Sequence, residues 1–357
     1  MWPYVLLILI PVLMQHFRYK STPEQISGDE KNRRAMVVFW SILTIMLILR
    51  HKDIGRDLDN YEIIFNMISR SDWKSALGRS AEFGYNFLNK VVSLFTTNFY
   101  WIMVLTSVFS IYFVARAYIR YSEDSSLTIA IFVIMSNFVL LFSGLRQAIA
   151  ISIGFVAYEL TKHKKIFFFI LIVLVAMLFH TSAFMLFFMY PLYHLKITRN
   201  WLFFVVPILG FIFIFNRQIF GTLTSILDKF TKYEGVISST GAYTMLILFC
   251  GFAVFAYLIP EESEMDDDTI GLRNFLLFSV VIQMFAPLHS IAMRMNYYYI
   301  IFIPLLIPKI ITYRSTRWKL LAEVGRHIMV VFFILYFFWS APRDNVLDTF
   351  PYKFFWQ

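Results

Sequence analysis

Two long apolar runs of this chain are each interrupted near the middle by a short polar group containing one ionisable side chain. Residues 126–160 are broken at 143–147 (Ser-Gly-Leu-Arg-Gln), which includes Arg146 and Gln147, and residues 166–195 are broken at His180. Arginine presents a planar fork of N–H donors that suits phosphate oxygens, and histidine can take up a proton near neutral pH. These residue types predict an anion-binding group and a general base.

The length of each run limits how it can lie in a membrane. A helix rises about 1.5 Å per residue, so either run is too long for one bilayer crossing and slightly short for two. We expect two helical hairpins whose polar apices sit at or just inside the membrane surface. An ionisable residue at that depth is expensive and indicates function, although Arg146 could instead reach toward lipid headgroups and His180 could be a hydrogen-bonded turn residue.

Two more polar motifs lie between the second and third apolar segments. Arg56 precedes Asp57, and Asp57 and Tyr61 are four residues apart, so they share a helical face. This motif either contacts substrate or orders the start of a helix through an Arg–Asp pair. Glu82 and Tyr85 flank a glycine, and an acid with an aromatic ring can bind sugar or can form a turn before an interfacial helix.

A late arginine forms the last motif. Arg294 follows His289, and Tyr297 and Tyr298 lie three and four residues further on, on the same helical face. The alternative role is an interfacial anchor. Several arginines on one side of a membrane, with no acidic cluster for a metal, favour an anionic substrate such as a diphosphate, and the sequence predicts no metal site and no cofactor.

The composition predicts an all-α, polytopic transmembrane helix bundle. Of the 357 residues, 59% are hydrophobic and 15% charged, whereas a soluble domain would have about 25% charged residues. We expect one integral membrane domain over 1–357, with the single Cys250 excluding a disulfide and with no role for nucleic acid despite the net charge of +9. Twelve segments are expected, over residues 2–17, 35–49, 99–115, 127–142, 146–160, 166–180, 181–195, 201–215, 242–259, 272–289, 295–311 and 327–341.

The linkers between these segments predict an orientation. One alternate set holds more than half of the 32 Lys and Arg residues and is therefore placed in the cytoplasm, with both termini outside. All the polar motifs then lie on the outer side. The long outer segment 50–98 is expected to form two amphipathic helices on the membrane face, with helical spacing in Tyr61, Ile64, Phe65 and Ile68 and in Leu88, Val91, Val92 and Phe95.

In combination, these motifs resemble the EpsG-like branch of the Wzy-type bacterial polysaccharide polymerases. The resemblance spans nearly the whole chain, and its hairpin motifs around Arg146 and His180 are the most specific. It departs at Arg56, since the family commonly has a small residue before the Asp. The motifs that carry it are Gly-Arg-Asp-x3-Tyr (55–61), Glu-x-Gly-Tyr (82–85), Gly-Leu-Arg-Gln-x-Ile-Ala (144–150), Phe-His-Thr-Ser-Ala (179–183), the late Arg with tyrosines (294–298) and Pro-Tyr-Lys-Phe-Phe (351–355).

The resemblance implies a GT-C-like glycosyltransferase in the bacterial cytoplasmic membrane. Such enzymes join oligosaccharide units carried on undecaprenyl diphosphate at the outer face, among membrane lipids and with a possible chain-length regulator protein as partner. The expected catalytic residues are His180, with Asp57 or Glu82 as an alternative base. The expected substrate-binding residues are Arg56, Tyr61, Tyr85, Arg146, Gln147, Arg294 and Tyr298.

Two other function classes remain open from the residues alone. A flippase or another transporter of lipid-linked oligosaccharide should show repeat symmetry and charges near the midplane rather than at one face. A membrane O-acyltransferase would place its key polar residues on the cytoplasmic side. The sidedness of residues 56, 146 and 180 separates these classes.

Overall fold

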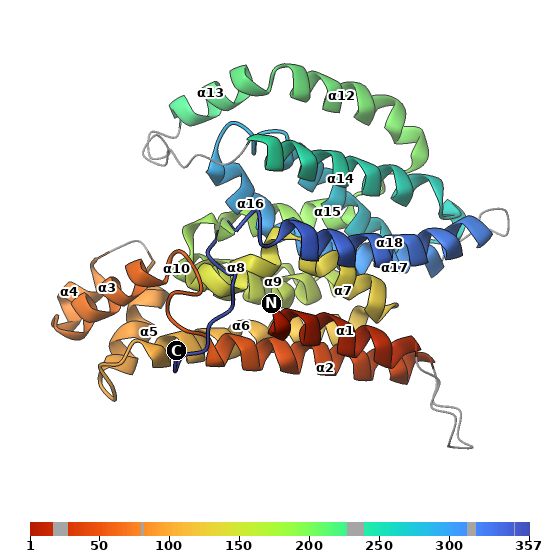
Figure 1. Cartoon of the computed structure of the whole chain (residues 1–357). Coiled ribbons are helices and arrows are strands. Elements are labelled where there is room, and N and C mark those ends of the chain that lie inside the picture. Colours follow the sequence, from red (N-terminus) through yellow and green to blue (C-terminus); the bar gives the residue numbers. More distant parts are fainter. Residues whose placement is uncertain (17–27, 80–81, 227–238, 313–318, 346) are drawn as a thin grey trace. The chain divides into compact units, whose positions relative to one another are not determined.

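Every regular element is helical in the part of the chain that the computed structural model describes, which confirms the all-α prediction (Figure 1). The described residues are 1–16, 28–79, 82–226, 239–312, 319–345 and 347–357. They form two compact units, one of residues 1–186 with 325–357 and one of residues 187–324. The site residues of the two apolar runs belong to the first unit.

The helices follow one another with short connections. The first unit holds α1 (Trp2–His16), α2 (Gly28–Leu49), α3 (Leu58–Ser69), α4 (Trp73–Leu77), α5 (Phe83–Ser93), α6 (Tyr100–Tyr121), α7 (Ser125–Ile134), α8 (Ser136–Ser143), α9 (Leu145–Lys162), α10 (Ile166–Phe179) and most of α18 (Lys319–Ser340). The 3₁₀ helix η1 (Thr181–Phe188) leads into the second unit. That unit holds α11 (Met189–His194), η2 (Arg199–Trp201), α12 (Leu202–Ile214), α13 (Asn216–Ile226), α14 (Ser239–Leu258), η3 (Glu262–Glu264), α15 (Asp267–Gln283), α16 (Ser290–Ile300) and α17 (Ile303–Thr312).

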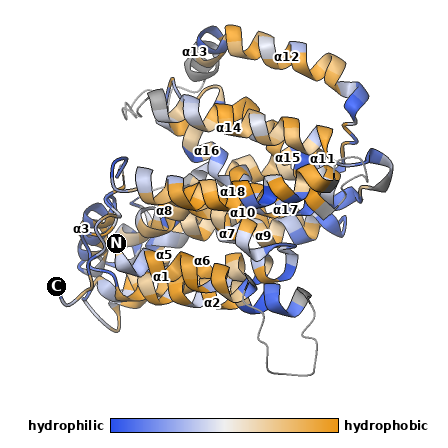
Figure 2. Cartoon of the chain, turned by 45° about the vertical axis from the view of Figure 1, so that its right-hand side comes forward, coloured by the Kyte–Doolittle hydropathy of each residue, from blue (hydrophilic) through white to orange (hydrophobic). Residues whose placement is uncertain are grey.

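Several of these helices suit a membrane. Four described helices are long and apolar enough to cross one, and the number rises to seven if each bent helix pair forms one span. Figure 2 shows hydrophobic residues along most of α6 and α12. The chain is therefore a multi-pass membrane protein, whereas the exact set of twelve segments stays a prediction.

The spanning helices of the first unit run between two ends of a bundle. At the end that we call the apex end, Tyr100 Oη donates to the carbonyl of Ile48 (2.8 Å) and Tyr4 Oη to that of Thr349. At the other, the basal end, the Asn32 side chain binds the backbone of Ser122 and Ser125, and Tyr121 donates to Glu159. α1, α6 and α9 thus run from the apex end to the basal end, and α2 and α10 run in the opposite direction.

The segment 50–98 forms three short helices at the apex end rather than two. α3 buries the predicted face, with Tyr61, Phe65 and Ile68 inside. α5 differs from the predicted spacing, because Phe95 lies beyond its end and is 85% exposed. The buried face of α5 is partly polar, and the Lys90 ammonium donates to the Ser71 carbonyl (2.6 Å). Large apolar side chains of α5 point outward, as they would on a membrane surface.

Both interrupted runs break where the sequence indicated, with two differences in local geometry. Gly144 separates α8 from α9, as predicted, but the first run has a second break at Met135, whose backbone is extended. After His180 the chain continues as a 3₁₀ helix, where an α-helix over 181–195 was expected. Residues Ile166 to Phe179 are apolar on all sides. They therefore show no hydrophobic periodicity from which the helix type of the following segment could be predicted.

Candidate functional site

A carboxylate joins the two ionisable residues of the apolar runs. Glu82 Oε1 lies 2.6 Å from His180 Nδ1, and Arg146 Nη1 donates to Glu82 Oε2. The exposed fractions of the side chains are 9% for Glu82, 14% for His180 and 27% for Arg146. We call these three residues the apex cluster. They lie far apart in the sequence, and Arg146 is the most exposed of the three.

Helix ends position all three side chains. Arg146 is the second residue of α9, His180 ends α10 with an extended backbone, and Glu82 immediately precedes α5. The glycine of the Glu-x-Gly-Tyr motif has a steric role here, because a Cβ on Gly84 would lie 3.1–3.2 Å from atoms of Leu178. The absence of a side chain at this position lets α5 approach α10 closely enough for Glu82 to reach His180.

Two tyrosines surround the arginine. The Arg146 guanidinium carbon lies 5.1 Å from the ring centroid of Tyr61 and 5.8 Å from that of Tyr85. The two rings are 5.6 Å apart and nearly edge to face. Cations are attracted to aromatic faces at such distances, so the rings hold the guanidinium in place. The structure thus brings together five of the predicted site residues.

The electrostatics of the cluster keep Glu82 ionised. Burial opposes ionisation, but the hydrogen bond to His180 and the charge of Arg146 outweigh it, and the pKa of Glu82 lies below its usual value. Ionised Glu82 can accept a hydrogen bond from His180 Nδ1, which lies 2.6 Å away. In the tautomer with the proton on Nδ1, the lone pair is on Nε2, and that atom can accept a proton.

The Gly-Arg-Asp motif contacts the apex between α8 and α9. The backbone N–H of Asp57 donates to Ser143 Oγ (3.1 Å). Gly55 has a φ of +128°, and a Cβ there would lie 2.2 Å from the Phe142 carbonyl oxygen, so only glycine fits. Asp57 is half-buried and Arg56 is exposed.

The chain is similar to a known protein family over most of its length. The model of the EpsG family matches residues 34–354, which is most of the sequence. The chain belongs to the EpsG family. This family consists of Wzy-like polysaccharide polymerases and implies a glycosyltransferase-like enzyme in a membrane. No curated protein and no solved structure matches the chain.

The EpsG match includes every predicted site residue, but they divide between the two units. Arg294 and Tyr298 belong to the second unit, where Arg294 is exposed and Tyr298 is 1% exposed. Gln147 is buried in the first unit beside Arg146. Roles for these three residues stay predictions.

The C-terminal residues 347–355 of this EpsG protein, which we call the strap, lie over the apex end. The sequence did not predict this contact. The N–H groups of Gly55 and Arg56 donate to the carbonyls of Asp348 and Leu347 (3.2 and 3.0 Å), and that of His51 donates to Lys353 (2.9 Å). The strap therefore holds the Gly-Arg-Asp loop, which also contacts the α8–α9 apex.

Arg50 is a further residue that the sequence reasoning missed. It is fully buried beneath the strap, its guanidinium carbon lies 6.0 Å from the Phe142 ring centroid, and its side-chain nitrogens find no hydrogen-bond partner in the described residues. Burial lowers the pKa of this guanidinium, which still carries its charge at neutral pH. The only sequence signal is an arginine directly after an apolar segment, which is also typical of a membrane boundary.

Proposed function

We propose that this protein joins lipid-linked oligosaccharide units into a polysaccharide, with the apex cluster as the centre of the reaction. The single observation that carries the proposal is the Glu82 carboxylate bridging Arg146 and His180. The cluster combines a cation for a leaving group with an oriented proton acceptor. The EpsG family supports the polymerase class.

In this proposal His180 is the general base and Glu82 positions it. Polymerisation requires a hydroxyl of the acceptor sugar to lose its proton as it attacks the anomeric carbon of the donor sugar. The Nε2 atom of His180 would take that proton, while the resulting imidazolium is stabilised by ionised Glu82 at Nδ1. The carboxylate itself is less suited as the base, because it already accepts hydrogen bonds from two cationic or potentially cationic groups.

Arg146 would stabilise the undecaprenyl diphosphate that leaves the donor. Only Nη1 is engaged by Glu82, and Nε of the guanidinium has no hydrogen-bond partner in the structure. Nε is itself buried, but the Arg146 side chain is 27% exposed, so a phosphate oxygen can approach the exposed part of the guanidinium. Charge-assisted hydrogen bonds there strengthen as negative charge develops on the leaving group. Arg294, in the second unit, stays a predicted diphosphate-binding residue on the basis of its sequence context.

The accumulated substrate tests this function directly. A strain that lacks the protein should accumulate single repeat units on undecaprenyl diphosphate at the outer face, and the wild-type gene should restore polymer. Extraction of lipid-linked glycans followed by mass spectrometry measures this. Failure to accumulate single units, or their retention on the inner leaflet as in a flippase defect, would refute the proposed function.

We further propose that the apex end faces the outside of the cell and the basal end the cytoplasm. The basal end carries the basic residues Lys162 to Lys165, as the positive-inside rule requires of a cytoplasmic end. In a variant with Cys250 replaced, a cysteine at exposed Lys74 should react with a membrane-impermeant thiol reagent in intact spheroplasts. A cysteine at exposed Lys164 should react only after permeabilisation, and the reverse pattern would invert the topology.

A further inference from the structure

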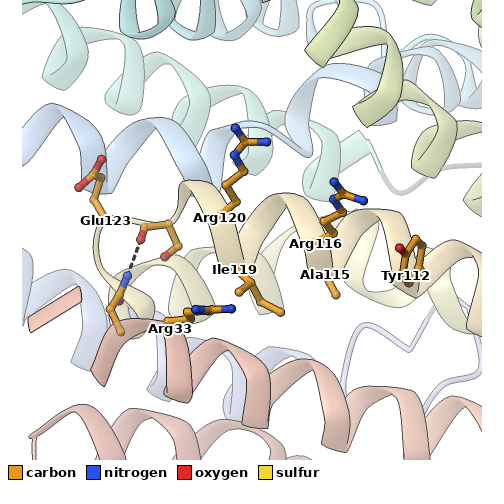
Figure 3. A pocket seen from close by; sticks show the side chains of 9 residues that line it. Arg33, Tyr112, Ala115, Arg116, Ile119, Arg120 and Glu123 are labelled. Carbon is orange, nitrogen blue, oxygen red and sulfur yellow. Dashed lines mark hydrogen bonds between the residues drawn. The ribbon is translucent and has the colours of Figure 1, made fainter. Parts of the chain in front are cut away.

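A groove at the basal end of the first unit has no part in the proposed reaction. It lies between α2 and α6, encloses about 890 Å³ and opens to the surface (Figure 3). Its wall is fixed by the buried Asn32 side chain, which donates to the Ser122 carbonyl and accepts from the Ser125 N–H. The groove is therefore a feature of ordered helix packing.

Three arginines line this groove. Arg33 comes from α2, and Arg116 and Arg120 leave the same side of α6 one turn apart (Figure 3). All three are exposed, and the described residues provide no ion-pair partner for Arg33 or Arg116. Arg120 is 3.9 Å from Glu159. Since Glu123 is the only acidic lining residue, the groove carries a net positive charge that suits a phosphate group.

Apolar side chains continue from the arginines along the outer faces of both helices. On α6, Leu105, Val108 and Tyr112 are 44–57% exposed and precede Arg116 at helical spacing. On α2, Val37 and Ile45 are 43% and 54% exposed on the face that begins at Arg33. Since both helices qualify as membrane spans, these stripes face lipid chains while the arginines sit at the span ends.

We propose that this groove binds an anionic phospholipid of the surrounding membrane. The arginines hold its phosphate, and its acyl chains lie along the exposed apolar faces of α2 and α6. Basic pockets between transmembrane helices bind anionic headgroups in this manner, and a soluble phosphate would leave the apolar stripes unused. The inference needs only the membrane location of the protein and holds for either orientation.

A lipid-binding measurement tests this site independently of polymerisation. Native mass spectrometry of the full-length detergent-purified protein should give tighter binding of dioleoyl phosphatidylglycerol than of dioleoyl phosphatidylcholine. The double variant R33Q/R116Q should weaken phosphatidylglycerol binding by about tenfold or more, whereas R33K/R116K should retain most of it. The matched control is R34Q/K164Q, which removes two basic charges at the same end but outside the groove, and its affinity should change by less than about twofold.

Three results would overturn the proposal. Equal loss of affinity in R33Q/R116Q and R34Q/K164Q would show general surface attraction rather than a site. Equal binding of the zwitterionic and anionic lipids would remove the role of the arginines. Displacement of the phosphatidylglycerol by inorganic phosphate at comparable concentration would show that the groove binds a free anion and that the apolar stripes contribute nothing.

Discussion

Replacing His180 by Ala is expected to slow polymerisation by about 10²–10⁴-fold, because a positioned general base contributes about that much to a rate. Single repeat units on their lipid carrier should accumulate in the same cells. His180→Gln should have a similar effect, since glutamine can still donate to Glu82 but cannot accept a proton. The measurement is the initial rate of polymer formation in isolated membranes at equal protein level.

The chain offers a matched control for this variant. His163 also lies near a carboxylate, with Nε2 at 3.9 Å from Glu159, but at the basal end and exposed. His163→Gln should therefore leave the rate unchanged. A near wild-type rate for His180→Gln would show that the histidine is structural and would return the base role to Asp57 or Glu82.

The pH dependence follows from the charge state of Glu82. Because its folded-state pKa is lowered, its stabilising contribution is fully present above its unfolded pKa and disappears only as the pH falls through the lower folded value. The Glu82–Arg146 pair should therefore stay intact at mildly acidic pH, and the thermal unfolding temperature should not fall there.

Replacing Arg146 by Ala is the second change with a large expected effect. It removes the cation proposed to bind the diphosphate, and loss of one such group typically costs about 10²–10³-fold in rate. It also leaves Glu82 buried beside His180 without its charge partner, which costs about 3–5 kcal/mol when a buried pair is broken. Arg146→Lys keeps the charge and loses the planar fork, so it should retain partial activity.

Stability must be separated from catalysis in this experiment. The double variant E82Q/R146Q leaves no unpaired charge, so it should unfold at a higher temperature than R146A while remaining inactive. Arg34→Ala, which breaks an exposed pair with Glu30, serves as the control and should preserve both properties. Wild-type polymer lengths from R146A at normal protein level would eliminate the diphosphate role.

A charge inside an apolar run is unusual, and for that reason the sequence singled out Arg146 and His180 as candidate site residues. The structure has a helix end beside each of them, as the sequence predicted. The contact between them was not predictable, because Glu82 lies 64 residues from Arg146 and 98 from His180 in the chain. No periodic pattern encodes such a pairing, and it depends on how α5 packs against α10.

The strap and Arg50 show a second limit of sequence reasoning. The Lys353 carbonyl accepts a hydrogen bond from the His51 N–H. Because only main-chain atoms make this contact, the side-chain type of Lys353 does not indicate it. Arg50 could equally have been a boundary residue facing headgroups. Its burial under the strap depends on a contact between opposite ends of the chain, and local propensity cannot report contacts of that range.

We propose that the apex cluster catalyses the joining of lipid-linked units. The most direct measurement uses purified wild-type and His180→Gln proteins in separate vesicles supplied with single repeat units on undecaprenyl diphosphate, with products separated by length. The account predicts a ladder of polymer lengths from the wild type and unreacted single units from a folded His180→Gln protein. A ladder of equal rate and length from both proteins would contradict it.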